Sequence, residues 1–169
     1  MFRNASTHLR TGLLILTLFS VLPMLRADNT KEISNLLSRA QEQAGALKTT
    51  ASDLQSFTRL GVRWDLRPET HIAKLTEMKE QLNGLLETIR KLDDLRSSAS
   101  VEQQEAIRRI QPPIRELTAN VRATLMHLNE NHQQLYTCVQ TDPAYAELLN
   151  LNATLAVRLA DVIGAAADL

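Results

Sequence analysis

Beyond residue 28, the apolar positions of this chain recur at alternating steps of three and four residues, the spacing that places side chains on one face of an α-helix. Turn residues separate several stretches of this kind. The apolar stripe of the first stretch, about residues 30–60, consists of Ile33, Leu37, Ala40, Ala44, Leu47, Ala51 and Leu54. The stripe of the second stretch, about residues 68–96, consists of Ile72, Leu75, Met78, Leu82, Leu85, Leu86, Ile89, Leu92 and Leu95. The pattern predicts an all-α chain.

The third stretch combines a helix start signal with a seven-residue repeat. Ser100 and Gln103, in the sequence SVEQ, have the spacing of a capping box. The seam that follows consists of Ile107, Ile114, Val121, Leu128 and Leu135. Pro112 and Pro113 lie inside this seam and remove backbone donors, but they leave the phase of the repeat unchanged. We therefore expect a third helix kinked at Pro112-Pro113, or a short helix followed by a longer one, rather than a domain boundary.

A fourth helix is predicted to extend to about residue 167. Asp142 and Pro143 have the pattern of an N-cap followed by proline at the first helical position. The predicted core face consists of Leu148, Leu151, Leu155, Leu159 and Val162. The connectors have fewer than about ten residues, so consecutive helices should lie antiparallel. The predicted fold is one domain, residues 28–169, an up-down-up-down four-helix bundle with the left-handed packing of a coiled coil.

The first 27 residues differ in character from the rest of the chain. A basic front precedes Gly12–Leu25, an uncharged apolar run that Pro23 breaks and that is shorter than the roughly 20 residues of a membrane span. Ala27 supplies a small residue for cleavage before Asp28. These features predict a signal peptide, residues 1–27, and an exported protein, periplasmic or extracellular, with no stable membrane span after cleavage. An uncleaved N-terminal anchor is the alternative.

Charge and cysteine content narrow the range of partners. The whole chain has 19 basic and 19 acidic residues, and removal of residues 1–27 takes away arginines but no acid. The remaining chain is therefore net acidic, which argues against a nucleic-acid partner. Cys138 is the single cysteine, so a disulfide can form between two chains but not within one. Packing of apolar side chains must stabilise the fold.

Some of these features together resemble an uncharacterised group of exported bacterial all-helical proteins. The resemblance rests on the N-terminal signal, the connector that contains Trp64, and the segments SVEQQEAIRRIQPPIREL (100–117) and HLNENHQQL (127–135). It covers most of the chain after residue 27. The resemblance implies a bacterial, extracytoplasmic protein and transfers no activity.

The histidines and methionines form few plausible ligand sets for a metal ion or a haem. His127 and His132 point about 140° apart on a regular helix and cannot share an ion there. His71 with His132, at one end of an antiparallel bundle, is the conceivable pair; separate exposed or hydrogen-bonded histidines are the other reading. Met78 or Met126 could ligate haem with a histidine, although methionine on an apolar helix face is usually core packing. Catalytic, di-iron and phosphate-binding motifs are absent from the sequence, so no enzyme is expected.

A cationic connector is the first candidate interaction site. Arg59, Arg63 and Arg67 surround Trp64 between the first two helices. This group could bind an anionic lipid, a glycan or a protein partner. Alternatively, Trp64 covers one end of the bundle while the arginines stay in water.

The end of the third helix offers candidate buried polar residues. In the stretch MHLNENHQQLYTC, the inner face of the predicted helix becomes polar. Asn131 or His132, with Cys138 beside it, is predicted to be a buried polar residue that fixes the register of the bundle near its end.

Two classes of function remain open. The first is an exported, non-enzymatic helical module without a cofactor, which binds a protein partner or forms a homo-oligomer; the regular seams and the missing catalytic motifs favour it. The second is a cofactor- or metal-binding four-helix bundle of the cytochrome or metal-storage kind.

Overall fold

A computed structural model describes the backbone of residues 12–59, 68–131 and 142–169, and the side chains of residues 29–57, 69–131 and 142–169. The long helices in these ranges are α1 (Gly12–Arg59), α2 (Pro68–Leu95), α3 (Val101–Glu130) and α5 (Pro143–Ala167). A short 3-10 helix, η1 (Arg96–Ser98), follows α2 directly. The described ranges contain no strand, which confirms the predicted all-α fold class.

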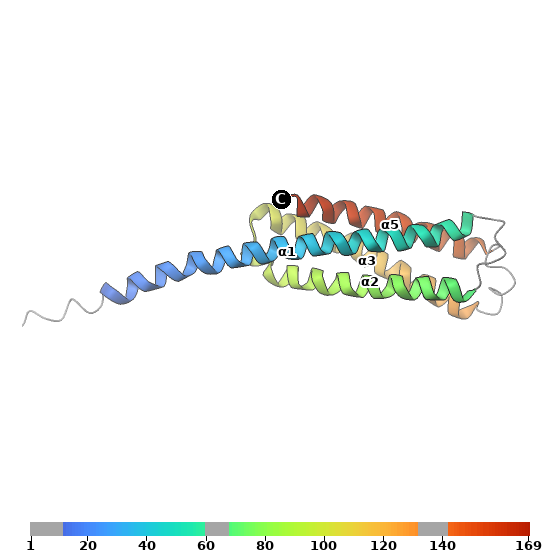
Figure 1. The fold of residues 1–169 in the computed structure, drawn as a ribbon, viewed down its shortest axis with the longest axis horizontal. Helices are drawn as coiled ribbons and strands as arrows, with labels where there is room; N and C mark the ends of the chain where they lie inside the picture. The colour runs from blue at the N-terminus through green and yellow to red at the C-terminus, as the bar shows by residue number, and fades with distance from the viewer. Residues whose placement is uncertain (1–11, 60–67, 132–141) are drawn as a thin grey trace, which may run out of the picture.

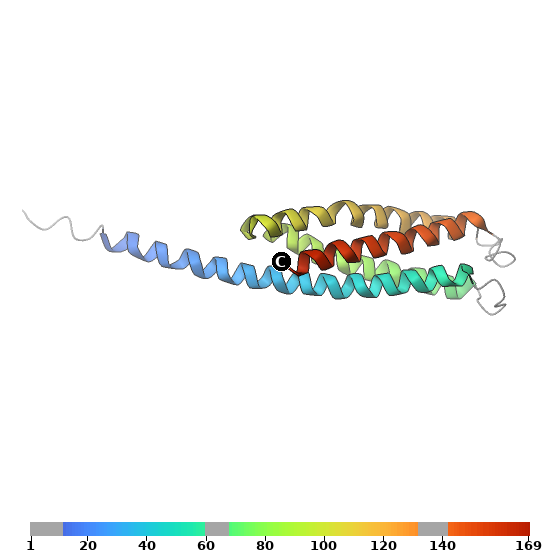
Figure 2. The same ribbon diagram turned by 90° about the horizontal axis from the view of Figure 1, so that it is seen from above.

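Successive helices run in opposite directions, so the architecture is the predicted up-down-up-down bundle (Figure 1, Figure 2). α1 packs against α2 and α5, and α5 packs against α3 as well. The contact between α2 and α3 is less extensive. The N-terminal part of α1 projects beyond the other helices at the end of the bundle where α5 finishes (Figure 1). α1 is thus much longer than the predicted helix of residues 30–60 and continues through Pro23, where a break was expected.

The core of the bundle contains most of the predicted apolar stripes. All seven stripe residues of α1 are buried. In the stripe of α2, Leu75, Met78, Leu82, Leu85, Ile89 and Leu92 are buried, Leu86 and Leu95 are partly buried, and Ile72 in the first turn is 37% exposed. In α3 the seam residues Ile107, Ile114, Val121 and Leu128 are buried, while Leu135 lies outside the described residues. These results follow from the regular spacing of large aliphatic residues, which leaves one choice of inward face.

The inward face of α5 differs from the predicted one. Leu151 is 44% exposed, and Leu148 and Val162 are only partly buried. The buried face consists of Tyr145, Leu149, Asn152, Ala153, Leu155, Ala156, Leu159, Ile163 and Ala166. The prediction was right for Leu155 and Leu159 and wrong for Leu148, Leu151 and Val162, because leucines also lie beside the true inward face and do not identify it by themselves.

The predicted start of α3 is confirmed, whereas the alternative of two separate helices at the prolines is not. Ser100 is the N-cap, and both bonds of the capping box with Gln103 are present. α3 continues as one helix through Pro112 and Pro113 and is bowed along its length (Figure 2). Pro113 is buried in the interface and Pro112 is exposed, so the second proline contributes apolar surface to the core. The two prolines therefore do not mark a domain boundary.

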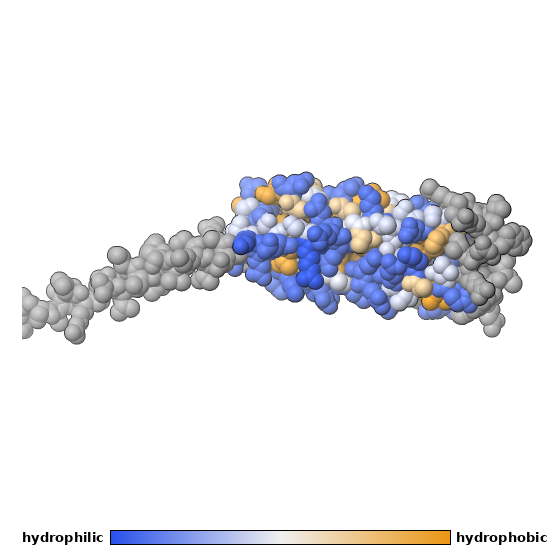
Figure 3. Space-filling view, viewed as in Figure 1, coloured by the Kyte–Doolittle hydropathy of each residue, from blue (hydrophilic) through white to orange (hydrophobic). Residues whose placement is uncertain are grey.

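The described exterior is mostly hydrophilic. On the face shown in Figure 3, apolar residues form small separate patches among polar ones. The exposed large apolar residues are Ile72, Val101, Met126, Leu151, Val157 and Leu169. Val101 and Leu169 are the most exposed of them, at 78% and 63%, and they begin α3 and follow α5 respectively.

Candidate functional site

A cluster of histidine, tyrosine and aspartate residues lies at the end of the bundle where α3 finishes and α5 begins. His71 of α2 and Tyr145 of α5 are fully buried, and the His71 Nδ1 atom lies 3.2 Å from the Tyr145 hydroxyl oxygen. His127 of α3 stacks on the Tyr145 ring, and its Nε2 atom lies 2.6 Å from Oδ2 of Asp142. The edge of Phe57 from α1 meets the His71 ring. Four helices thus contribute to this group, which we call the connector-end cluster.

Local sequence explains how α5 places its members of the cluster. Asp142 is the N-cap of α5, and its Oδ1 atom accepts hydrogen bonds from the backbone N–H groups of Ala144 and Tyr145. Its other carboxylate oxygen is therefore free to meet His127. The same residue starts the helix and orients an imidazole, so the cap and the tertiary contact stabilise each other.

Burial and charge set the protonation of the cluster. Burial lowers the pKa of His71, so the neutral imidazole is favoured. Burial, with the charge of Asp142 nearby, raises the pKa of the Tyr145 hydroxyl, which stays protonated. For Asp142, burial acts to raise the pKa, but the hydrogen bonds from His127 and from the backbone of Tyr145 and Ala144 outweigh it, and the pKa is lowered. The cluster is therefore a Tyr–His hydrogen bond beside an Asp–His pair.

This arrangement leaves little capacity for a metal ion. Within the described ranges, no three histidine, cysteine, aspartate or glutamate side chains are close enough together to bind one. His71 uses Nδ1 on Tyr145, and His127 uses Nε2 on Asp142. A His–Asp pair can also activate a nucleophile, but among the described residues the His127 ring bonds only to Asp142. The contacts are those of a structural cluster that closes one end of the bundle.

Most of the side chains predicted to form sites lie outside the described ranges. The side chains of Arg59, Arg63, Trp64 and Arg67 lie outside them, as do His132 and Cys138. The pair His71–His132 and the cationic connector therefore stay predictions. Asn131 is the C-cap of α3 and is partly buried; its side-chain amide donates to the His127 carbonyl oxygen at 2.9 Å.

A buried polar network that sequence reasoning missed lies between α3 and α5. The side-chain amide of Asn120 donates to Oδ1 of Asn152 at 2.9 Å and to the Leu148 carbonyl oxygen at 3.0 Å. Asn152 in turn donates to Oγ1 of Thr124, and both of these residues are fully buried. An axial shift of α3 against α5 would break these bonds. We therefore interpret this network as fixing the register of the two helices, the role that the sequence predicts for Asn131 or His132. The available signal was an asparagine at a core position of an otherwise apolar helix.

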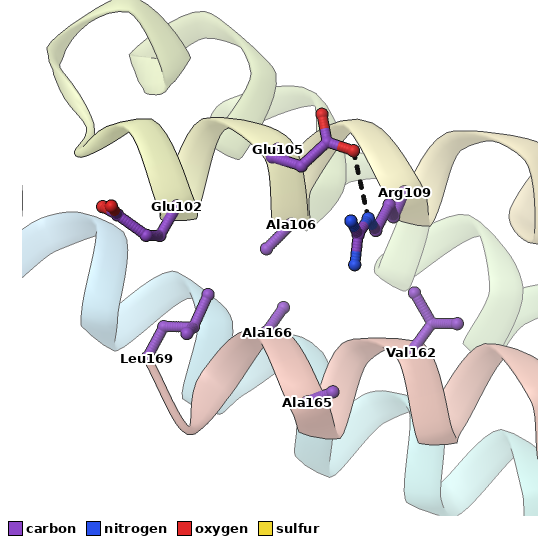
Figure 4. A pocket seen from close by; sticks show the side chains of 8 residues that line it. All are labelled: Glu102, Glu105, Ala106, Arg109, Val162, Ala165, Ala166 and Leu169. Carbon is purple, nitrogen blue, oxygen red and sulfur yellow. Dashed lines mark hydrogen bonds and ion pairs between the residues drawn. The ribbon is translucent and has the colours of Figure 1, made fainter.

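The opposite end of the α3/α5 interface is open. A groove of about 430 Å³ lies there between α3 and α5 (Figure 4). It is lined by Glu102, Glu105, Ala106, Arg109, Val162, Ala165, Ala166 and Leu169. In Figure 4 Ala106 and Ala166 point toward each other across the groove. Small side chains at facing positions leave this space unfilled, and we call it the α3/α5 groove.

A second hollow, of about 500 Å³, lies on the outer side of α3 and is lined by arginines around Pro112. The guanidinium groups of Arg108 and Arg109 both bond to Glu105. That of Arg115 donates to the Gln111 carbonyl oxygen at 3.2 Å. Because these arginines are already engaged on their own helix, this hollow is a weaker candidate for a binding site than the α3/α5 groove.

Fold and contacts together define the class of the protein: an antiparallel four-helix bundle with a closed polar cluster at one end and an apolar groove at the other. No family model, curated protein or solved structure matches this chain. α5 has the length and hydropathy of a membrane span, a property that apolar core helices share, and here its inward face packs against α1 and α3.

Proposed function

We propose that this protein is an exported, non-enzymatic helical module that binds another protein. The observation that carries the proposal is that the imidazole groups of His71 and His127 are bonded to Tyr145 and Asp142 within the chain. A haem or metal site would need such groups to face a shared open space. Satisfied histidines beside a continuous apolar core are typical of a bundle that acts through its surface.

The position of the predicted cleavage point supports export. Cleavage before Asp28 would fall in the part of α1 that projects beyond the other helices (Figure 1). The first buried residue of the core, Ile33, comes after this point. Removal of residues 1–27 would therefore leave the packed bundle intact, as processing of a signal peptide requires. The proposed compartment is periplasmic or extracellular, in a bacterium.

Metal analysis and absorption spectroscopy test the non-enzymatic, cofactor-free part of the proposal. The protein should be purified from its own compartment without added metal. We expect no stoichiometric metal and no absorption band in the visible range. A Soret band, or one metal ion per chain, would favour the alternative of a cytochrome-like or metal-storage bundle.

The N-terminus of the purified protein tests export separately. Sequencing should find a start near Asp28 in the soluble fraction. A chain that keeps Met1 and sediments with membranes would instead have an uncleaved N-terminal anchor.

A further inference from the structure

The α3/α5 groove has a structural origin in the register of the two helices. The bond between Asn120 and Asn152 aligns α3 with α5, so residues further toward the start of α3 face residues further toward the end of α5. By this register, Pro113 faces Leu159, and both are buried. Seven residues further toward the end of the bundle, Ala106 and Ala166 face each other (Figure 4). Two methyl groups stand there in place of a proline ring and a leucine side chain, and the interface opens.

The groove has the size and character of a pocket for apolar side chains. A cavity of roughly 150 Å³ holds a benzene ring, so a groove of about 430 Å³ can take two or three large apolar side chains. Apolar atoms form most of its surface, and the exposed Leu169 stands at one end. An apolar hollow with a polar rim is typical of a site where a helix of another protein inserts its anchor residues.

The charges around the groove select the partner. Glu102 lines one end, and its carboxylate accepts a hydrogen bond from Ser100, which keeps its pKa low together with bonding to the backbone. Asp161 and Asp168 are exposed and stand one turn before and one turn after Ala165 on α5. Arg108 and the lining residue Arg109 both pair with Glu105. With Glu102, Asp161 and Asp168 counted, the acidic groups around the groove still outnumber the basic ones, and lysine or arginine on a partner would be attracted to them.

We propose that the α3/α5 groove binds an amphipathic helix of a partner protein, with two or three large apolar residues on one face and basic residues beside them. This inference rests on the proposed function and identifies the chemistry of the partner. A second copy of the chain is a poorer occupant, because it presents a rim of the same acidic sign.

Two synthetic peptides test the charge and shape of the site. Both are 18 residues long and place leucines on one helical face; one has lysines beside the leucines and the other has glutamates in the same positions. Binding of each labelled peptide to the protein purified from its own compartment is measured by fluorescence anisotropy. We expect the lysine peptide to bind at least tenfold more tightly than the glutamate peptide, and to bind more weakly as salt is raised.

Substitutions place the binding within the groove. Ala106→Leu fills the hollow, and Ala165→Arg adds bulk and positive charge at an exposed position that the fold tolerates. Each should weaken binding of the lysine peptide at least tenfold, since each excludes an anchor side chain. The matched control, Ala119→Arg, changes an exposed alanine of α3 outside the groove and should change binding less than twofold. Removal of two rim charges, Glu102→Gln with Asp168→Asn, should weaken it about two- to fivefold.

Several outcomes would overturn the inference. Equal binding of the two peptides would remove the charge argument. Binding that survives Ala165→Arg would place the site elsewhere. Concentration-dependent dimerisation in sedimentation experiments, abolished by Ala165→Arg, would make a second copy the occupant. None of these results depends on metal content. The peptide experiments can therefore disprove binding at the groove while the protein remains a cofactor-free module, and metal analysis can disprove the cofactor-free module while the groove still binds the peptide.

Discussion

The same alignment of α3 with α5 produces a filled interface at one end of the bundle and an open one at the other. At the connector end, large aromatic and imidazole rings fill the space, and hydrogen bonds join His71 to Tyr145 and His127 to Asp142 between helices. At the groove end, Ala106 and Ala166 face each other and leave about 430 Å³ open. The comparison separates two roles within one bundle: a closed end that contributes stability, and an open end where exposed residues such as Ala165 and Leu169 border a hollow. Substitutions at the two ends should therefore have very different effects.

The largest expected effect is that of Tyr145→Ala at the closed end. Tyr145 is fully buried between His71 and His127, so the substitution should reduce the free energy of unfolding by about 3–5 kcal/mol. Leu169→Ala, the matched truncation at the groove end, removes a side chain that is 63% exposed and should cost under about 0.5 kcal/mol. Urea unfolding followed by circular dichroism measures both. Similar losses at the two ends would contradict the comparison.

A smaller effect is expected between the two ends, at Asn152. Asn152→Leu leaves Thr124 without its donor and removes one acceptor of Asn120. The free energy of unfolding should fall by about 1–3 kcal/mol, the usual cost of unpaired buried polar groups. Asn150→Leu, on the exposed side of α5, is the control; it removes only a solvent-exposed hydrogen bond from Gln55 and should cost less, under about 1 kcal/mol. A stability gain for Asn152→Leu would mean that the network specifies register at the expense of stability.

Acidification should act on the closed end in two steps. Burial lowers the pKa of folded His71 below 6.5, so the unfolded chain binds the proton more readily. The contribution of neutral His71 is thus complete above pH 6.5 and is lost as the pH falls toward the folded pKa. Asp142, whose folded pKa lies below 3.8, contributes fully above that value and loses its contribution only in stronger acid.

Urea unfolding at a series of pH values checks this order. His71→Phe should remove the loss of stability that begins below pH 6.5 and keep the later loss. Ala165→Arg at the groove end should leave both steps in place. An unchanged profile in His71→Phe would show that another group titrates in the upper range.

The smallest expected effect is that of Ala165→Arg on stability. Ala165 is exposed at the edge of the groove, so the free energy of unfolding should change by no more than about 0.5 kcal/mol. The same variant is expected to weaken peptide binding strongly. Circular dichroism and anisotropy on one preparation compare the two properties. A large stability loss would mean that the groove end belongs to the packed core.

Local signals in the sequence were enough for the helices and much of the core. The Ser100–Gln103 capping box, the Asp142-Pro143 start and the seven-residue seam of α3 all appear in the structure. Each depends on residues a few positions apart, whose spacing is preserved by the chain itself. For the same reason the antiparallel order followed from short connectors. The candidate buried polar residue Asn131 is the C-cap of α3 and is partly buried.

Tertiary structure decided the inward face of α5 and both candidate sites. Leucines of α5 lie both on and beside its inward face, so packing against α1 and α3 decides that Tyr145 and Asn152 are buried and Leu151 is exposed. The bond between His71 and Tyr145 joins residues 74 positions apart, and that between Asn120 and Asn152 joins residues 32 apart. Pairings of this kind depend on the rotation and axial register of whole helices. By itself the sequence determined which segments are helical and in what order they fold back; how the helices face one another, and where they leave a groove, came from packing, since no local spacing encodes it.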